Sequence, residues 1–482
     1  MGICNVEFGT TAAETELMRT PKIFDEAFFD PNNYLQELVD GYKFIVSGRK
    51  GDGKTAFLAK IERLSVAKST NVYALIEDLE HLNSIFFDKF TDEDLSGGKR
   101  YVPMWKCIIL LELTKYLQNK NFRIEKENYL AIVDALDKMG LLSSDGIDST
   151  ITKLDATEIS ISVKNWVTYG RRIERDKILK GANDIYSALE KELSDVYLSK
   201  CKFRMIIDGL DDILRNKEFK PEIVTGLVRA ANEVNNSFLK KTLNFKVIVL
   251  IRSDILDKCR DPDISKIKNA SLIALSWKPV HDAYDCELGK LVLQRFKMAN
   301  LFFDNFKALW TTYFPTTIDG KDSLAYMLEN TLHKPRDMLV FFSLAKKMIG
   351  PVDRKLCETE FKEVLRMYSE EYFYSQMQDE LTGFVSDNAI EEIAAVVSQI
   401  GSRTFTLEQF EEEAKNHAEF ENESAENVLR VMFDRGYIGQ YRKRPEHPKE
   451  EFYFQTSINQ REKFSQTDTC QIHRGLVRAF GI

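Results

Sequence analysis

Eight consecutive residues, Gly48 to Thr55, carry the clearest chemical signal in the chain: Gly-Arg-Lys-Gly-Asp-Gly-Lys-Thr, with the spacing G-x-x-x-x-G-K-T. Glycines let backbone N–H groups curl around phosphate oxygens, and a following helix adds its partial positive charge. We expect Lys54 to reach the β- and γ-phosphates and act in catalysis, and the Thr55 hydroxyl to ligate Mg²⁺. The residues expected to contact the nucleotide are Gly48, Arg49, Lys50, Gly51, Asp52, Gly53, Lys54, Thr55 and Ala56. The pattern predicts binding of ATP with Mg²⁺.

A group of carboxylates follows an apolar run later in the chain, in Asp208-Gly209-Leu210-Asp211-Asp212. We expect Asp208 to hold Mg²⁺, directly or through water, together with Thr55. Asp211 and Asp212 are candidates to orient or deprotonate an attacking water. Alternatively these two residues cap the next helix, because Asp favours helix N-termini. The first interpretation predicts hydrolysis of the nucleotide.

Two arginines are candidates for contact with the γ-phosphate. Arg252 ends an apolar run, and a guanidinium at that sheet edge would face the phosphate; the alternative is a surface pair with Asp254. Arg336 lies in His333-Lys334-Pro335-Arg336-Asp337, which predicts the start of a helix. From there Arg336 either reaches back to the nucleotide or pairs with Asp337.

The elements that must position these residues predict an α/β fold. Runs that are apolar throughout, separated by helical stretches, favour a parallel sheet covered on both faces, with right-handed crossovers. The expected strands are residues 43–47, 70–76, 203–208, 246–252 and 271–277. We therefore expect a P-loop NTPase core with a mainly parallel sheet over residues 41–285, after a lead-in segment at 1–40.

Three further regions are expected around and after this core. Residues 100–200 form a largely helical insertion, with helix over 105–117 and over 160–191. The alternating stretch 157–163 within it is either a β-hairpin arm or an extra edge strand.

Residues 286–378 have helical periodicity and predict a lid, and residues 379–482 predict a winged-helix domain. In the latter, a helix stops at Gly401, Thr406 opens a second helix with a capping box, and Ser424 caps a third. Two strand-like runs, 437–442 and 451–455, then form the wing.

Composition narrows the class of protein. The formal net charge is −8 over 482 residues, which argues against a chain built as a polycation for nucleic acid. Seven scattered cysteines without a C-x-x-C pair predict reduced thiols. With no signal-peptide core and no apolar run near the ~20 residues of a membrane span, we expect a soluble, cytoplasmic protein without membrane contact.

Three segments, 48–55, 205–212 and 249–252, resemble the STAND class of P-loop NTPases, particularly its NACHT branch. That branch has a small residue after the Mg²⁺-binding Asp and an acidic pair three and four positions on, and an Arg ends its sensor strand. Two features depart from it. Lys334-Pro335-Arg336 lacks the preceding Gly of the STAND lid motif, and no C-terminal repeat array is found in these residues.

The order of lid and winged helix is similar both to STAND proteins and to the AAA+ origin-recognition ATPases. The loop Arg-Lys-Gly-x-Gly-Lys and the tail segment His473-Arg474-Gly475-Leu476 are similar to bacterial P-loop ATPases linked with antiphage defence. The resemblance implies an ATPase that acts as a switch in antiviral defence.

Three functions remain open at this point. The first is an ATP-driven conformational or assembly switch that self-associates or acts on a partner effector, since the six scattered histidines build no effector site. The alternative is a DNA-binding ATPase of the origin-recognition (Orc/Cdc6-like) type. Residues 401–482 carry 12 Lys and Arg against 14 Asp and Glu, a net charge of −2, which favours protein over DNA as the partner. The third is a nucleotide-binding scaffold with negligible turnover, in which Asp211 and Asp212 serve only as caps.

Overall fold

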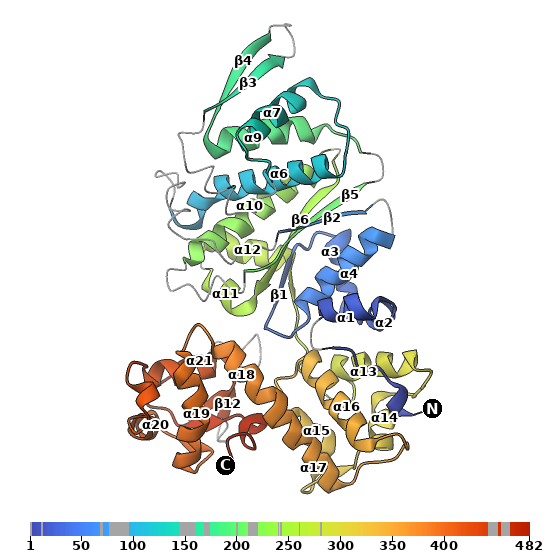
Figure 1. Ribbon diagram of the computed structural model, residues 1–482, viewed down its shortest axis with the longest axis vertical. Coiled ribbons are helices and arrows are strands. Elements are labelled where there is room, and N and C mark those ends of the chain that lie inside the picture. The colour runs from blue at the N-terminus through green and yellow to red at the C-terminus, as the bar shows by residue number, and fades with distance from the viewer. Residues whose placement is uncertain are drawn as a thin grey trace. The chain divides into compact units, whose positions relative to one another are not determined.

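The computed structural model describes residues 2–10, 13–67, 71–76, 96–143, 150, 160–167, 174–198, 201–210, 220–239, 241, 243–259, 261–279, 282–441, 452–454 and 463–482 (Figure 1). The chain forms two compact units. The sheet unit comprises Asn32–Lys50 and Phe57–Leu275, and the lid unit comprises Met1–Pro31, Gly51–Ala56 and Ser276–Ile482. Each unit is described below by itself.

A five-stranded, all-parallel sheet forms the centre of the sheet unit. In spatial order its strands are β2 (Asn71–Ile76), β5 (Lys202–Ile207), β6 (Phe245–Arg252), β1 (Ile45–Gly48) and β7 (Leu272–Ala274). Every residue of β6 is buried, as expected for a strand covered on both faces. The five predicted strands are therefore confirmed, although β7 ends at Ala274, three residues earlier than expected.

Helices on both faces provide that cover, among them α3 (Tyr34–Val39), α4 (Lys54–Ala67), α10 (Pro221–Leu239), α11 (Ser253–Lys258) and α12 (Pro262–Ser271). Two buried cations on neighbouring strands hold the end of α3. Lys246 Nζ donates to the carbonyls of Leu38 at 2.6 Å and Gly41 at 2.8 Å, and Arg204 Nε donates to Val39 at 2.7 Å. Cations at a helix C-terminus satisfy its unpaired carbonyls and favour its dipole.

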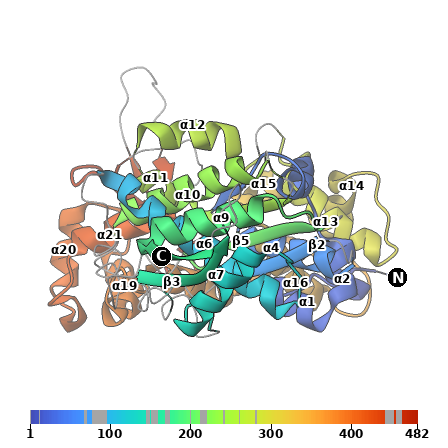
Figure 2. The same ribbon diagram turned by 90° about the horizontal axis from the view of Figure 1, so that it is seen from above.

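The insertion of the sheet unit contains η3 (Gly97–Tyr101), α6 (Val102–Asn119), α7 (Glu127–Lys138), β3 (Ser160–Val167), β4 (Glu174–Lys180) and α9 (Gly181–Ser194). The helix predicted over 160–191 is wrong for its first half, because β3 and β4 pair antiparallel from Ser160↔Lys180 to Val167↔Glu174. The hairpin alternative is confirmed. Successive residues of the hairpin differ in burial, with Ile178 exposed and Leu179 buried in β4 and Ser162 exposed and Val163 buried in β3, and β3 lies beside α7 (Figures 1 and 2). Burial with period two thus overrides the helical pattern.

Helices of the lid surround an aromatic core. They are α13 (Glu287–Met298), α14 (Phe306–Tyr313), α15 (Ser323–Leu328), α16 (Pro335–Ile349) and α17 (Glu358–Met367). A π-helical turn, η5 (Tyr368–Phe373), joins α17 to α18 (Tyr374–Leu381). Rings in contact within the core are those of Phe296, Trp310, Phe314, Phe341, Phe342 and Phe361. Two short strands, β8 (Thr317–Ile318) and β9 (Lys321–Asp322), form a hairpin before α15.

The N-terminal residues pack onto the lid helices. Ile3, in η1 (Ile3–Asn5), and Phe8 are buried in the same core. Lys346 Nζ donates to Val6 O at 2.8 Å, and Arg295 Nη2 binds Glu16 Oε2 at 3.0 Å in a buried ion pair. Helices α1 (Ala13–Arg19) and α2 (Pro21–Ala27) complete this segment.

The last part of the lid unit has three helices and an antiparallel sheet, the expected winged-helix arrangement. The helices are α19 (Asp387–Ile400), α20 (Leu407–Ala414) and α21 (Ala425–Arg435), with η6 (Ala418–Phe420) between the last two. The sheet runs β10 (Thr404–Phe405), β13 (Cys470–Ile472), β11 (Ile438–Tyr441), β12 (Phe452–Phe454).

The predicted helix ends of this domain are confirmed. Gly401 is left-handed, with φ +68°. Thr406 and Gln409 form the reciprocal capping box, and the Ser424 side chain accepts from Asn427 N. Among the helices that the structure describes, none is both long and apolar enough to span a membrane.

The C-terminal tail, residues 473–482 with η7 (Arg474–Leu476), fastens the winged helix to the lid. Ser369 Oγ, in the π-helical turn, donates to Gly475 O at 2.6 Å. Arg478 Nη1 donates to Asn330 Oδ1 at 3.1 Å. The tail is therefore joined to the lid by hydrogen bonds at Gly475 and at Arg478.

His473 makes this junction sensitive to pH. The ring is buried, accepts from Gly475 N at 3.0 Å through Nδ1 and stacks on Phe373, and burial lowers its pKa to about 3. Because an unfolded histidine binds its proton near pH 6.5, the stabilisation is complete above that pH. As the pH falls from 6.5 to 3, we expect the free energy of unfolding to decrease by about 1.4 kcal/mol for each pH unit.

Hydrogen exchange of residues 473–482 as a function of pH measures this effect. The matched control is His473→Asn, whose side-chain oxygen can accept from Gly475 N but does not titrate. We expect the free energy of opening to depend less steeply on pH in the variant than in the parent chain. The difference in slope should correspond to the uptake of up to one proton on opening. Equal slopes in both proteins would contradict the assignment.

Candidate functional site

The phosphate loop combines two left-handed glycines with the start of a helix. Gly51 has φ +91° and Gly53 has φ +93°, values that side chains with a Cβ rarely adopt. Ala56 N donates to Gly53 O at 3.0 Å, and α4 begins at Lys54. The loop glycines therefore have the conformation that directs successive N–H groups to one side, as an anion requires.

Two polar side chains of the loop are buried, Lys54 at 7% exposure and Asp52 at 3%. Thr55 is the next residue of α4, at the helix N-terminus where a bound phosphate is favoured. A buried lysine beside this helix end fits the charge of a nucleotide phosphate. A hydroxyl at Thr55 fits an Mg²⁺ ligand, because Mg²⁺ prefers oxygen donors.

Trp277, at the start of the last segment of the lid unit, binds the backbone of the loop. Its Nε1 donates to Asp52 O at 2.9 Å, and the indole is buried next to Phe29. With that carbonyl held by the indole, the loop backbone is fixed before a ligand binds. The strand predicted over 271–277 ends at Ala274 instead, and the position of Trp277 at the loop was not predicted. A large aromatic residue just past a core strand is the one sign of it in the sequence.

Lys334 from the lid lies against the same loop. A Cβ placed on Gly51 would be 3.1 Å from Lys334 Cδ, so the aliphatic stem of the lysine covers the glycine. Lys334 Nζ binds Glu380 Oε1 at 3.0 Å, and the side chains are only 2% and 4% exposed. The lid thus brings a fully buried ion pair to the phosphate loop. Neither residue was predicted from the sequence, although Lys334 is two positions before the predicted Arg336.

Asp337 holds the lid turn in shape. Its carboxylate accepts from Leu332 N at 2.9 Å, Lys334 N at 3.1 Å and Tyr372 Oη at 3.1 Å, and burial raises its pKa. Arg336 Nη1 instead donates to Gln376 Oε1 at 3.1 Å. Among the described residues Arg336 therefore binds Gln376 rather than the predicted partner Asp337, and its proposed role in nucleotide binding stays a prediction.

His333, which directly precedes Lys334 in the lid turn, has φ +55°. A left-handed conformation costs a residue with a Cβ of the order of 1 kcal/mol. We expect His333→Gly to keep or raise the stability of the lid unit, within about 1 kcal/mol. His333→Val should lower it by about 2 kcal/mol, because β-branched residues tolerate this region least. Thermal unfolding of the two variants measures the difference, and equal melting temperatures would contradict it.

The remaining predicted residues belong to the sheet unit, where strand register places them. Gly48 pairs with Arg252 at the end of β1 and β6, and Arg49 and Lys50 follow Gly48. The Arg252 guanidinium is buried and binds Asp254 through Nε at 3.0 Å and Nη2 at 2.9 Å. The pairing with Asp254 is confirmed, and a contact with the γ-phosphate stays a prediction.

Asp208 follows β5, whose last residue, Ile207, pairs with Val249 of β6. Its Oδ1 accepts from Gly209 N at 2.9 Å, and Gly209 has φ +85°. A carboxylate at the carboxyl end of a parallel strand fits an Mg²⁺ ligand. Asp211 and Asp212 lie outside the described residues.

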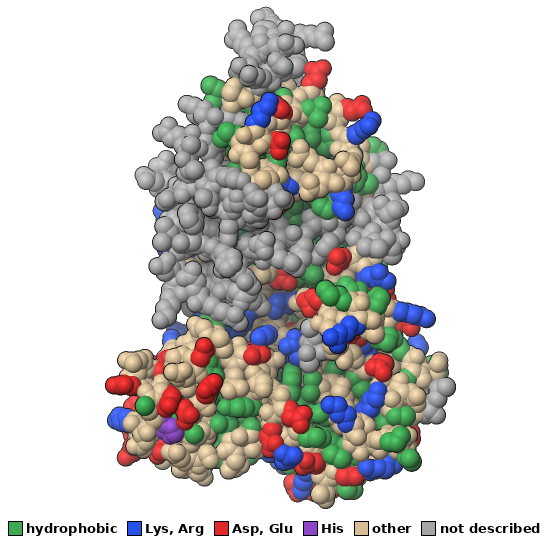
Figure 3. Space-filling model, in the orientation of Figure 1, with side chains coloured by type: hydrophobic (Ala, Val, Ile, Leu, Met, Phe, Trp, Pro, Cys, Tyr) green, Lys and Arg blue, Asp and Glu red, His purple; other side chains and the backbone are tan. Residues whose placement is uncertain are grey.

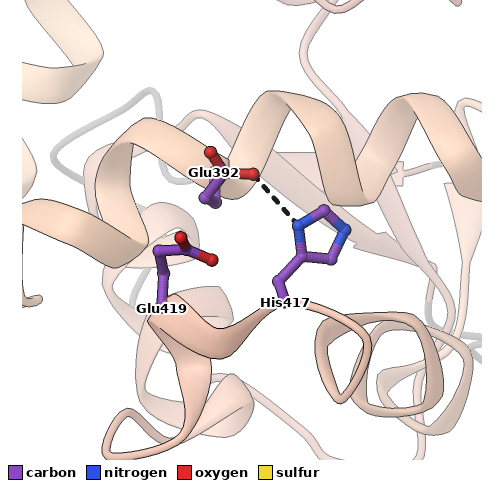
Figure 4. Close-up of side chains that lie close together, drawn as sticks. All are labelled: Glu392, His417 and Glu419. Carbon is purple, nitrogen blue, oxygen red and sulfur yellow. Dashed lines mark hydrogen bonds and ion pairs between the residues drawn. The ribbon is translucent and has the colours of Figure 1, made fainter.

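A histidine of the winged helix also lies among carboxylates (Figure 4). His417 Nδ1 is 3.0 Å from Glu392 Oε2, Nε2 is 3.1 Å from Gln399 Oε1, and Glu419 lies beside them. Both ring nitrogens therefore have protein partners. These contacts connect α19 to the segment before η6.

A family model, the FunZ-associated C-terminal helical domain, matches residues 286–375, which span the lid from α13 to η5. No curated protein matches the chain with significance.

Solved structures similar to the chain include the Aeropyrum pernix ORC2 protein in ADPNP–ADP complexes, with 12% identity, coverage of 96% of this chain and 95% of that chain, and a TM-score of 0.42. The Aeropyrum pernix ORC1 protein in complex with DNA has 9% identity, coverage of 96% and 95%, and a TM-score of 0.40. Cdc6p from Pyrobaculum aerophilum has 12% identity, coverage of 98% and 95%, and a TM-score of 0.32.

Proposed function

We propose that this chain is an Mg²⁺-dependent ATPase that works as a conformational or assembly switch. The observation that carries the proposal is the phosphate loop itself. Its glycines are left-handed, its lysine is buried at a helix start, and Trp277 holds its backbone. Binding of a triphosphate requires these features, and an ordinary glycine turn does not require them.

The roles proposed for individual residues follow from their chemistry. Lys54 and the N–H groups of the loop bind and orient the β- and γ-phosphates. Thr55 and Asp208 would hold Mg²⁺, which when bound neutralises charge that develops on the phosphates. Asp211 and Asp212 orient the attacking water or take its proton. Arg252 and Arg336 stabilise the γ-phosphate.

The lid and winged helix are proposed to respond together to the nucleotide. Both belong to one compact unit, and the tail joins them through Ser369, Gly475, Asn330 and Arg478. A change at the loop would then reach the winged helix without a separate hinge. Differential contacts with the nucleotide are what bias such an equilibrium.

A protein is the proposed partner, either a second copy of this chain or an effector. Figure 3 shows Asp and Glu side chains gathered over the face of the winged helix in view. Exposed acidic residues of α19 to η6 include Glu391, Glu408, Glu412 and Glu419. Such a surface repels phosphate backbones, so a DNA-binding ATPase of the origin-recognition type is the weaker alternative. A role in bacterial antiviral defence is also proposed, and it rests on resemblance to antiphage ATPases.

Phosphate release with and without Mg²⁺ tests the ATPase, and light scattering in ATP–Mg²⁺ or ADP tests the switch. We expect turnover only with Mg²⁺, and a mass that rises with ATP but not with ADP. Asp208→Asn should lower turnover about 100-fold or more while ATP still binds. ATP binding without turnover would leave a scaffold, and a mass independent of nucleotide would rule out self-assembly as the output.

A further inference from the structure

We propose that Lys334 and Glu380 form an exchangeable latch on the phosphate loop: Lys334 leaves Glu380 for a phosphate of the bound nucleotide, and Tyr437 of the winged helix replaces it as donor to Glu380. The inference rests on the proposed function in one respect, that residues 48–55 bind a nucleotide. It adds how the lid and the winged helix detect that nucleotide. All three side chains and Gly51 belong to the lid unit.

Lys334 already lies at the loop. Its Cδ would be 3.1 Å from a Cβ on Gly51, and Nζ is two bonds further along a flexible chain. Rotation of the last torsions moves the ammonium between Glu380 and the loop while the stem stays in place. A phosphate held by the loop would therefore compete with Glu380 for the same cation.

The ion pair is built for exchange rather than for stability. Both side chains are almost completely buried, and desolvation of two buried charges largely offsets their attraction. Removal of one partner, however, leaves the other as an unpaired buried charge, which is costly. Lys334 can leave only if Glu380 gains another donor.

Tyr437 provides that donor. The residue precedes β11 and is fully buried, and within the described part of the chain its Oη has no hydrogen-bond partner. The ring of Tyr437 packs against Phe373, with ring centroids 5.6 Å apart, and Phe373 ends the π-helical turn that continues into α18, the helix of Glu380. Burial raises the pKa of Tyr437, and the charge of Glu380 raises it further. A buried hydroxyl without a partner costs free energy, and a hydrogen bond to Glu380 would recover it.

The exchange couples the nucleotide to the winged helix. Glu380 belongs to α18 and Tyr437 to the turn between α21 and β11. In one state Glu380 is bound by the lid, and in the other by the winged helix. The latch therefore has two discrete arrangements, as a switch element needs.

Dissociation constants for ATP, measured by calorimetry without Mg²⁺ so that no turnover occurs, test the latch. We expect Glu380→Gln to bind ATP about tenfold more tightly than the parent chain, because Lys334 loses a charged competitor. Tyr437→Phe should bind about fivefold more weakly in the parent chain, yet change affinity by less than about twofold in the Glu380→Gln background. A tyrosine with only a packing role would have the same effect in both backgrounds.

A neutral pair keeps the test valid if single changes impair folding. Lys334→Met with Glu380→Met removes both charges, and we expect this variant to fold and to be insensitive to Tyr437→Phe. Circular dichroism confirms the fold of each protein. Lys54→Ala, which should weaken binding in every background, reports on the loop itself.

Each outcome has one meaning. If Glu380→Gln binds ATP no more tightly than the parent chain, or if Tyr437→Phe acts equally in both backgrounds, the latch is wrong while the nucleotide site stands. If the parent chain binds no ATP, the proposed function is wrong and the latch with it. The comparison of parent chain and Lys54→Ala separates these two failures.

Discussion

Replacement of Lys54 by alanine is expected to lower ATP turnover by about a thousandfold and to weaken ATP binding. Lys54 is buried at the first position of α4, directly after Gly53, and its charge is proposed to contact the β- and γ-phosphates. The loss combines weaker ground-state binding with lost stabilisation of charge in the transition state. Single-turnover phosphate release with enzyme in excess, together with calorimetry, measures the two parts separately.

Lys60→Ala is the matched control, since Lys60 is a partly exposed lysine on the same helix. We expect this variant to retain turnover within about twofold, because surface substitutions seldom change a distant site. If Lys54→Ala kept more than a tenth of the parent activity, the loop would not be the catalytic site. The same would follow if the two variants lost activity equally.

Replacement of Gly475 by alanine is expected to destabilise the lid unit by about 2–3 kcal/mol. A Cβ at this position would lie 2.4 Å from Asn330 O and 2.8 Å from Phe373 Cε1. The carbonyl is backbone and cannot move without displacing the lid turn. Gly475 O also accepts the Ser369 hydroxyl, so the strain falls on the contact that joins tail and lid.

Gly481→Ala in the same tail separates close packing from backbone strain. Gly481 is left-handed, with φ +68°, but an added Cβ would meet only Ser398 Oγ, at 4.0 Å. We expect this variant to cost about 1 kcal/mol. Thermal unfolding and hydrogen exchange of residues 326–333 and 473–482 distinguish the two variants. Gly475→Ala should increase hydrogen exchange in both segments. If the variant and the parent chain exchanged at equal rates, the tail would not depend on this contact.

Local signals allowed the sequence to determine much of the architecture. The parallel sheet was predictable because β5 and β6 are mainly apolar and do not alternate between apolar and polar residues along their length, a pattern typical of strands buried on both faces. Thr406 with Gln409 and the glycine at 401 define helix ends through contacts that span only a few residues. The phosphate loop was equally predictable, since its glycines, lysine and helix start are consecutive.

Partners that are distant in sequence were decided by the tertiary structure alone. Trp277 binds Asp52 across 225 positions, and Lys334 binds Glu380 across 46, spacings that no local pattern encodes. The hairpin of β3 and β4 was one of two alternatives for 157–163, and helix was wrongly predicted for β4, for the same reason: burial against other elements decides between the two periodicities. Apolar runs, caps and glycines thus determined which elements form and where the nucleotide loop lies. Packing between remote segments decided which side chains meet that loop, because burial and ion pairing depend on neighbours that only folding brings together.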